Sequence, residues 1–314
     1  MSWRRHAAAV RRARAALERH GDRLRRRRGV VAVGVGPRRR QGRPFPGEVC
    51  LQVFVRRKPR PLAAIPLRMR LPASVDGVPI DVVEAHFVGA LGCAVAESDR
   101  RVRHATLVGG IALASTTSDR FGTLGALLED DVAVYALTAA HVVETSAADV
   151  AQPFYAPDWI GEVEAFRWST ASNLDAALVR VAVASGRAVA PGMLDGPTGS
   201  LGTGDVRTAR GPLVVHGACN GRVEADVSSS PWAGTIGYED GHSITLRDQV
   251  AITPRAGRLD HGDSGAAVLD RTESVLLGIV IGGNAQGTTA IVTPIDSILD
   301  AKAFRPAGTR LVPI

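Results

Sequence analysis

The residues best suited to chemistry are a serine between two glycines and two polar residues upstream of it. Ser264 lies in the run His261-Gly262-Asp263-Ser264-Gly265-Ala266-Ala267. A serine hydroxyl is a weak nucleophile, so it needs a base to take its proton and an anion to orient that base. His141 ends one apolar, strand-like run and Asp175 opens another. These three residues predict a nucleophile, a general base and an orienting carboxylate, in the order His141, Asp175, Ser264.

That chain order separates the known arrangements of this chemistry. The α/β-hydrolase order requires a histidine after the serine, but no histidine follows His261, and Ala266 stands where the nucleophile elbow has glycine. The subtilisin order requires an aspartate well before the histidine, and Asp131 precedes His141 by only ten residues within the same apolar run. The order that remains is that of chymotrypsin.

Three segments resemble bacterial chymotrypsin-like (trypsin-like) serine peptidases. Residues 138–142 resemble their Thr-Ala-Ala-His segment, residues 175–181 resemble their Asp-Ile-Ala-Leu strand, and residues 262–265 match their Gly-Asp-Ser-Gly. The resemblance covers about residues 107–300 and implies a serine endopeptidase with an oxyanion hole formed by the N–H groups of Gly262 and Ser264. The chain departs from the pattern at Val142, where secreted animal enzymes have cysteine, and at Ala266-Ala267, where Gly-Pro is usual.

The acidic residues near these motifs have different expected roles. Asp149 and Asp158 are alternatives to Asp175 as the orienting carboxylate, but only Asp175 opens an apolar run in the matching pattern. Asp263, next to the nucleophile, is expected to be a buried anion that stabilises its loop.

The resemblance also indicates a substrate pocket. It places Ile281, Gly282 and Gly283 along the wall that pairs with the substrate backbone. It places Arg258, six residues before Ser264, at the base of the pocket for the side chain that precedes the scissile bond. A guanidinium there would favour Asp or Glu. An ion pair with Asp260 would neutralise it and leave a preference for small apolar side chains, which Ile281 and Ala290 suit.

The elements that must position these residues are strands. The sequence predicts a mostly β fold, with two six-stranded antiparallel β-barrels of chymotrypsin type in a peptidase domain at residues 91–314. A small basic α+β module is expected at residues 1–90. Within it, apolar residues recur at helical spacing over about residues 4–27, and strand-like runs follow at 30–35, 49–55 and 80–83. The helical positions are Val10, Ala13, Leu17 and Leu24. This module resembles the N-terminal extension of a bacterial and plant group of trypsin-like proteins.

Charge is distributed unevenly along the chain. Residues 1–70 contain 21 Arg or Lys and three acidic residues, a net charge of +18, whereas the whole chain carries +7 and the remainder therefore −11. Such a segment is compatible with weak binding of polyanions, nucleic acid included. It supports an alternative function, in which an inactive or weak peptidase fold serves as a binding or scaffold protein.

Several classes of site and location are disfavoured by the sequence. Three scattered cysteines do not form a disulfide framework, which favours a reducing compartment. No sequence motif indicates a metal or another cofactor. Arginines at positions 11, 12 and 14 interrupt any signal-peptide core, and glycines divide the uncharged run 274–295 into two strands, so no transmembrane segment is expected. These features predict a cytoplasmic protein that acts on proteins or peptides, with an undefined oligomeric state.

Overall fold

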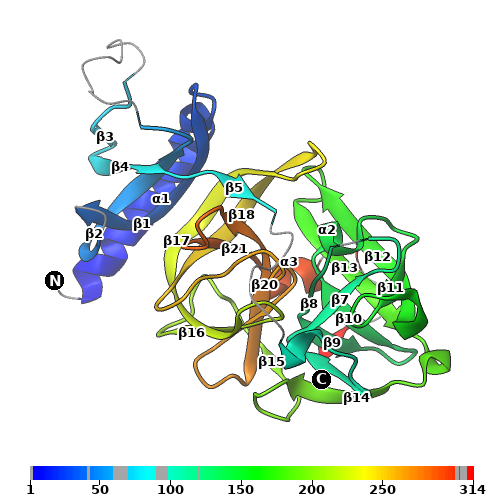
Figure 1. Ribbon diagram of the computed structural model, residues 1–314. Coiled ribbons are helices and arrows are strands. Elements are labelled where there is room, and N and C mark those ends of the chain that lie inside the picture. Colours follow the sequence, from blue (N-terminus) through cyan, green and yellow to red (C-terminus); the bar gives the residue numbers. More distant parts are fainter. Residues whose placement is uncertain are drawn as a thin grey trace.

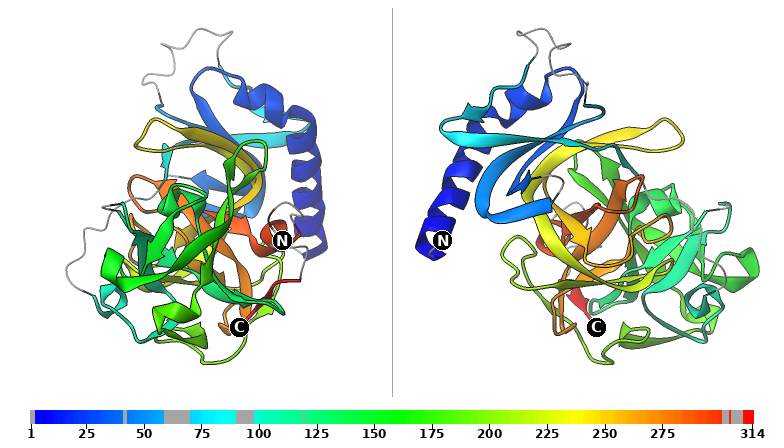
Figure 2. Two further views of the ribbon diagram at one scale, coloured as in Figure 1. Left: turned by 90° about the vertical axis from the view of Figure 1, so that its right-hand side faces the viewer. Right: turned by 60° about the vertical axis from the view of Figure 1, so that its left-hand side comes forward.

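The computed structural model describes residues 3–40, 43–58, 70–89, 98–118, 120–300, 304 and 310–314. Most elements are strands, which form two curled sheets, and a long helix lies on the outer side of one of them (Figures 1 and 2). The predicted mostly β architecture of two barrels is confirmed.

The basic N-terminal module is built around one amphipathic helix. Helix α1 (Trp3–Arg25) turns Ala13, Leu17 and Leu24 inward onto strands β1 and β2, as its spacing predicts. Arg11, Arg12 and Arg23 of the same helix are exposed. The packed side chains form a small core of their own with residues of β4. The strands of this module are β1 (Val30–Arg40), β2 (Arg43–Val55), β3 (Ser74–Val75), β4 (Val78–Glu84) and β5 (Phe87–Val88).

The first barrel is closed by a strand that bends at Gly125. Strands β8 and β9 lie on either side of Gly125, at the two ends of the run β9-β10-β13-β12-β11-β7-β8, so the bend brings these ends together. Strand β22 (Val312–Pro313), from the end of the chain, pairs with β9 in the same sheet. A side chain at Gly125 would lie 2.1 Å from the Gly265 carbonyl, which explains the glycine. The elements of this part are η3 (Asp99–Arg101), β6 (Thr106–Gly109), β7 (Ile111–Ser115), β8 (Gly122–Leu124), β9 (Ala126–Glu129), β10 (Val134–Thr138), α2 (Ala140–Val143), β11 (Asp149–Ala151), η4 (Ala156–Asp158), β12 (Trp159–Ser169), β13 (Leu174–Val181), η5 (Val183–Ser185) and β14 (Ala188–Met193).

The second barrel follows the order β16-β19-β20-β21-β18-β17 and closes through pairing of β16 with β17. The uncharged run 274–295 forms β20 and β21 with a turn between them, as expected from its glycines. The elements are β15 (Gly202–Thr203), β16 (Leu213–Gly217), β17 (Gly221–Gly237), β18 (Ser243–Pro254), β19 (Ala267–Leu269), β20 (Val275–Asn284), β21 (Ala290–Pro294) and α3 (Ile295–Leu299). No helix in the described ranges is long and apolar enough to cross a membrane.

The N-terminal module extends the sheet of the second barrel. Strand β17 continues past the barrel and pairs with β1, with Ala32 opposite Gly234, so β1, β2, β4 and β3 follow it in one continuous sheet. Figure 1 shows β5 leading from this module towards the junction of the two barrels. A domain boundary near residue 90 stays a prediction.

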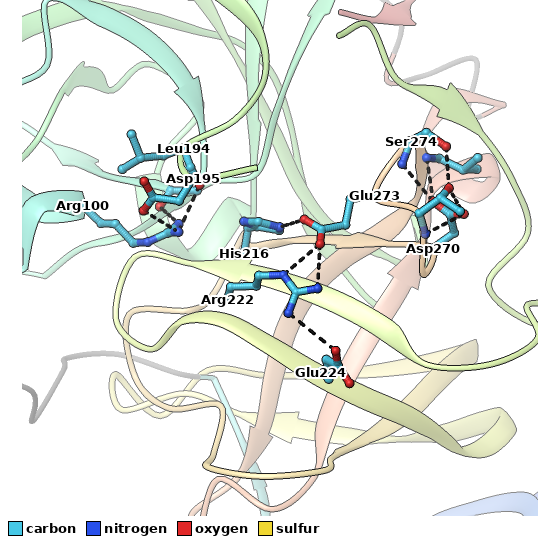
Figure 3. A network of polar contacts seen from close by, with 12 residues as sticks. Arg100, Leu194, Asp195, His216, Arg222, Glu224, Asp270, Glu273 and Ser274 are labelled. Atoms are coloured by element: carbon cyan, nitrogen blue, oxygen red, sulfur yellow. Dashed lines mark hydrogen bonds and ion pairs between the residues drawn. The ribbon is translucent and has the colours of Figure 1, made fainter. Parts of the chain in front are cut away.

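Polar contacts around Arg100 and around His216 lie next to each other (Figure 3). Arg100 donates to the carbonyls of Gly110 and Leu194, at 3.2 and 3.0 Å. Gly110 also lies against His216 of β16, whose Nε2 is 2.7 Å from a carboxylate oxygen of Glu273. Burial lowers the pKa of His216, although the Glu273 carboxylate opposes this shift. The pair is therefore a neutral imidazole bonded to an anion.

The cysteines differ from one another in state. Cys50 is a free, buried thiol, whereas Cys219 is disulfide-bonded. Composition had indicated no disulfide framework, and the bond at Cys219 removes the argument from cysteine usage for a reducing compartment.

Candidate active site

His141 and Asp175 form a buried pair at the inner end of the first barrel. His141 lies in α2, directly after β10, and β10 pairs with β13 so that Thr138 lies opposite Ala177. The same register brings Asp175 beside the start of α2. Its two carboxylate oxygens accept hydrogen bonds from the His141 backbone N–H at 3.1 Å and from Nδ1 at 2.6 Å. The carboxylate therefore fixes both the position and the tautomer of the imidazole.

Tyr238 adds a third hydrogen bond to this carboxylate. Its hydroxyl donates to Asp175 Oδ2 at 2.7 Å, and its ring centroid lies 5.1 Å from that of His141. Trp168 packs against Tyr238 on the same side, with ring centroids 4.9 Å apart. No motif marks Tyr238, which directly follows β17, so sequence reasoning missed it. The aromatic cover keeps the side chains of His141 and Asp175 1% and 0% exposed.

The loop that carries Ser264 packs against the segment that carries His141. The Ser264 carbonyl accepts from the N–H of Thr123 at 2.7 Å. A side chain at Gly265 would lie 2.4 Å from Thr138 Oγ1 and 3.1 Å from the Ala139 nitrogen, so only glycine permits this approach. Ser264 is fully buried, and His141 Nε2 is buried with no hydrogen-bond partner among the described residues. The Ser264 loop thus packs against the segment that carries His141, and His141 Nε2 makes no hydrogen bond with it.

Asp263 stabilises this loop, as its sequence position suggested. It is fully buried, and its two oxygens accept from the backbone N–H groups of Cys219, Asn220 and Asp260 and from the Asn220 side chain. Burial raises the pKa of Asp263, and these four donors oppose the shift. The loop is therefore supported from within, by residues of the second barrel.

Gly262 has a left-handed backbone conformation. Its φ of +97° is favourable only for glycine, and its carbonyl accepts from Thr123 Oγ1 at 2.8 Å. The carbonyl therefore points towards the first barrel.

A small cavity of about 10 Å³ adjoins this loop. Its described lining consists of Val88, Leu259, Asp260, His261, Val280, Gly282, Gly283, Asn284 and Ala290. Gly282 and Gly283 line this cavity, whereas Arg258 and Ile281 are not among its described lining residues. The assignment of these four residues to a substrate pocket stays a prediction. Arg258 is half-exposed and its Nε pairs with Asp260 at 2.9 Å, and Ile281 alternates with Val280 along β20 and packs into the main core on the opposite face.

The two rival aspartates have other partners. Asp149 accepts from the indole N–H of Trp159 at 2.9 Å, and Asp158 pairs with Arg103 and Arg187 at 2.9 and 3.3 Å. Among the described residues, no group of three or more His, Cys, Asp or Glu side chains is placed to hold a metal ion.

Comparison with solved structures identifies the fold. Protease A of Thermobifida fusca matches with a TM-score of 0.51 and 20% identity, over 67% of this chain and 100% of that one. The fold is that of the chymotrypsin-like serine proteases. A glutamic acid specific serine protease that uses a histidine triad in substrate binding matches with a TM-score of 0.50 and 20% identity, over 66% and 100% of the two chains.

A Nocardiopsis protease has the same chymotrypsin-like fold, with a TM-score of 0.50 and 17% identity over 65% of this chain and 99% of its own. These three proteins cover about two thirds of the present chain. No protein-family model matches the chain, and no curated protein matches it in sequence.

Proposed function

We propose that the protein is a serine endopeptidase that cleaves peptide bonds through an acyl-enzyme on Ser264. The observation that carries this proposal is the buried His141–Asp175 pair beside the Ser264 loop, with Nε2 of the imidazole unbonded among the described residues. A general base needs a fixed tautomer and a fixed orientation, and burial beside Asp175 supplies both to His141. A histidine without a catalytic role has no such requirement.

In the first half-reaction, the Ser264 hydroxyl oxygen attacks the carbonyl carbon of the scissile bond, and its proton moves to His141 Nε2. Asp175 stays ionised and stabilises the imidazolium, because its oxygens already bind the backbone N–H and Nδ1 of His141. The oxyanion accepts from the N–H groups of Gly262 and Ser264. One such donor contributes roughly 3 kcal/mol in the transition state.

The imidazolium then returns its proton to the leaving amine, and the C–N bond breaks to leave an ester on Ser264, which completes the first half-reaction. In the second half-reaction, a water attacks the ester with His141 again as base. His141 then returns the proton to the Ser264 oxygen, and the carboxylic acid is released. No group beyond this chain and water is required.

The cavity lined by Gly282, Gly283 and Ala290 supports a preference for a small side chain before the scissile bond. Its volume is about 10 Å³, roughly what one water molecule requires. The Arg258–Asp260 ion pair keeps the guanidinium out of its lining. One related structure is a glutamic acid specific protease with a histidine triad in substrate binding, but the described lining here holds a single histidine, His261.

A peptide library incubated with the full chain tests both parts of the proposal. We expect cleavage by the wild type, none by Ser264→Ala, and a preference for Ala or Gly before the cut bond that Arg258→Ala leaves unchanged. Equal cleavage by wild type and Ser264→Ala would refute the mechanism. Efficient cleavage after Asp or Glu that is lost in Arg258→Ala would make Arg258 the selector after all.

A further inference from the structure

Strand β5 (Phe87–Val88) is held between two strands of the second barrel. Val88 lies opposite Gly283 and Phe87 opposite Asn284 in antiparallel pairing with β20, and Val88 also pairs in parallel with Gly237 of β17. The next residue, Gly89, donates its N–H to the Gly237 carbonyl at 2.9 Å. The end of the N-terminal module is thereby paired on both sides.

The edge of β20 that β5 occupies adjoins the proposed nucleophile. Within β20, Val280 exchanges hydrogen bonds with the loop after Ser264: its carbonyl accepts from Gly265 and its N–H donates to Ala266, at 2.7 and 2.9 Å. Three residues further along the same strand, Gly283 pairs with Val88. Val88 also lines the cavity beside the Ser264 loop, and a side chain at Gly282 would lie 2.7 Å from the Val88 carbonyl.

Gly89 brings this segment against the catalytic pair. It is buried, and a Cβ atom there would lie 2.2 Å from the Tyr238 ring. Tyr238 in turn contacts the His141 ring and bonds Asp175. The extended backbone of this segment therefore runs along β20, and the Tyr238 ring lies between Gly89 and His141. The Tyr238 ring leaves room only for glycine at position 89.

The segment is anchored upstream of these contacts. Phe87 is 1% exposed and packs edge-on against Phe54 and Trp232, at centroid distances of 5.4 and 5.1 Å. Phe54 belongs to the N-terminal module and Trp232 to β17. The short strand β5 thus has a fixed anchor but only two residues in strand pairing, an arrangement from which a competing peptide can displace Val88 and Gly89.

We propose that Phe87–Gly89 is a substrate-like strand that occupies the enzyme's own peptide-binding edge and competes with external substrates. It also shows the class of peptide that the edge accepts: an extended backbone alongside Gly283, with glycine where the chain passes Tyr238. This inference rests on the proposed function for its catalytic consequence, but the occupied edge is an observation independent of it.

Binding to the inactive full-length Ser264→Ala protein tests the inference without catalysis. Acetyl-Phe-Val-Gly-amide should compete with β5 and raise the hydrogen-exchange rate of the Gly89 N–H. It should bind about tenfold or more tightly than acetyl-Phe-Val-Val-amide, which carries side-chain atoms into the Tyr238 ring. Unchanged exchange at Gly89 with bound peptide, or equal affinity for the two peptides, would overturn it.

Variants of the active chain test the catalytic consequence. Gly89→Val places atoms in the Tyr238 ring, and Val88→Pro cannot pair on both sides, so both should raise kcat/KM for an internally quenched peptide roughly tenfold or more. The matched control is His86→Ala, an exposed residue of the same segment. Equal kcat/KM for the control and the variants would refute self-competition. Peptide binding that displaces β5, with no hydrolysis by any variant, would instead refute the proposed function alone.

Discussion

Replacement of Asp175 by asparagine separates the electrostatic role of this residue from its structural role. Asp175 Oδ1 accepts from the His141 backbone N–H, which an amide oxygen can also do. The amide nitrogen would then take the place of Oδ2 and donate a hydrogen bond to His141 Nδ1. Nδ1 would therefore accept a hydrogen bond instead of donating one. The proton of the neutral imidazole moves to Nε2, where it blocks the transfer from Ser264.

The expected loss follows from that change of tautomer. The equivalent change in a chymotrypsin-type triad lowers kcat by about 10⁴, or roughly 5.4 kcal/mol in activation free energy. The fold should persist, because the side chains are isosteric and Tyr238 can reorient its hydroxyl to accept. Peptide hydrolysis is measured for Asp175→Asn and for the matched control Asp149→Asn, whose partner is Trp159. A normal rate for Asp175→Asn, or an equal loss in both, would show that the orienting role lies elsewhere.

Three further predictions concern stability and charge. Tyr238→Phe removes a hydrogen bond to a buried carboxylate and should lower the free energy of unfolding in urea by about 1.5–3 kcal/mol. The control Tyr155→Phe, at a 66% exposed residue, should change it little. Equal effects would show that the Tyr238–Asp175 bond does not stabilise the fold. Burial lowers the pKa of His216 below its usual 6.5, so as the pH falls the imidazole binds a proton more readily in the unfolded chain, and the folded state loses stability below about pH 6.5. The His216→Gln variant should lose less stability between about pH 7 and 5 than the wild type. An identical loss would contradict this. The +18 charge of residues 1–70 should retain the protein on heparin at low salt and release it as salt rises, and absence of retention would mean that the charge is only solvated.

The sequence predicted the parts of this protein that depend on local pattern. The apolar spacing of α1 and the strand-like runs of β1, β2 and β4 matched the structure because these elements bury apolar side chains that are close in sequence. The two-barrel fold was predicted differently, from the resemblance of the segments around His141, Asp175 and Ser264 to chymotrypsin-like peptidases.

The remaining features depend on contacts between distant segments. The residues of β1 do not indicate that β17 is its pairing partner, because any strand edge offers the same backbone groups. The contact of Tyr238 with Asp175 depends on the path of β17, and the ion pair of Arg258 with Asp260 depends on the fold of the loop before Gly262. Strand β5 has only two residues, which is too short for a sequence pattern to predict as a strand. The sequence therefore could not predict that β5 pairs with the edge of β20.

Covalent labelling of the full chain tests the central claim most directly. A fluorophosphonate should form an adduct that mass spectrometry locates on the peptide containing Ser264. The adduct should be absent from Ser264→Ala and nearly absent from His141→Ala, because the hydroxyl is activated by the imidazole. No adduct on the wild type, or an equal adduct on Ser264→Ala, would contradict the assignment of Ser264 as nucleophile and favour a peptidase fold retained for binding.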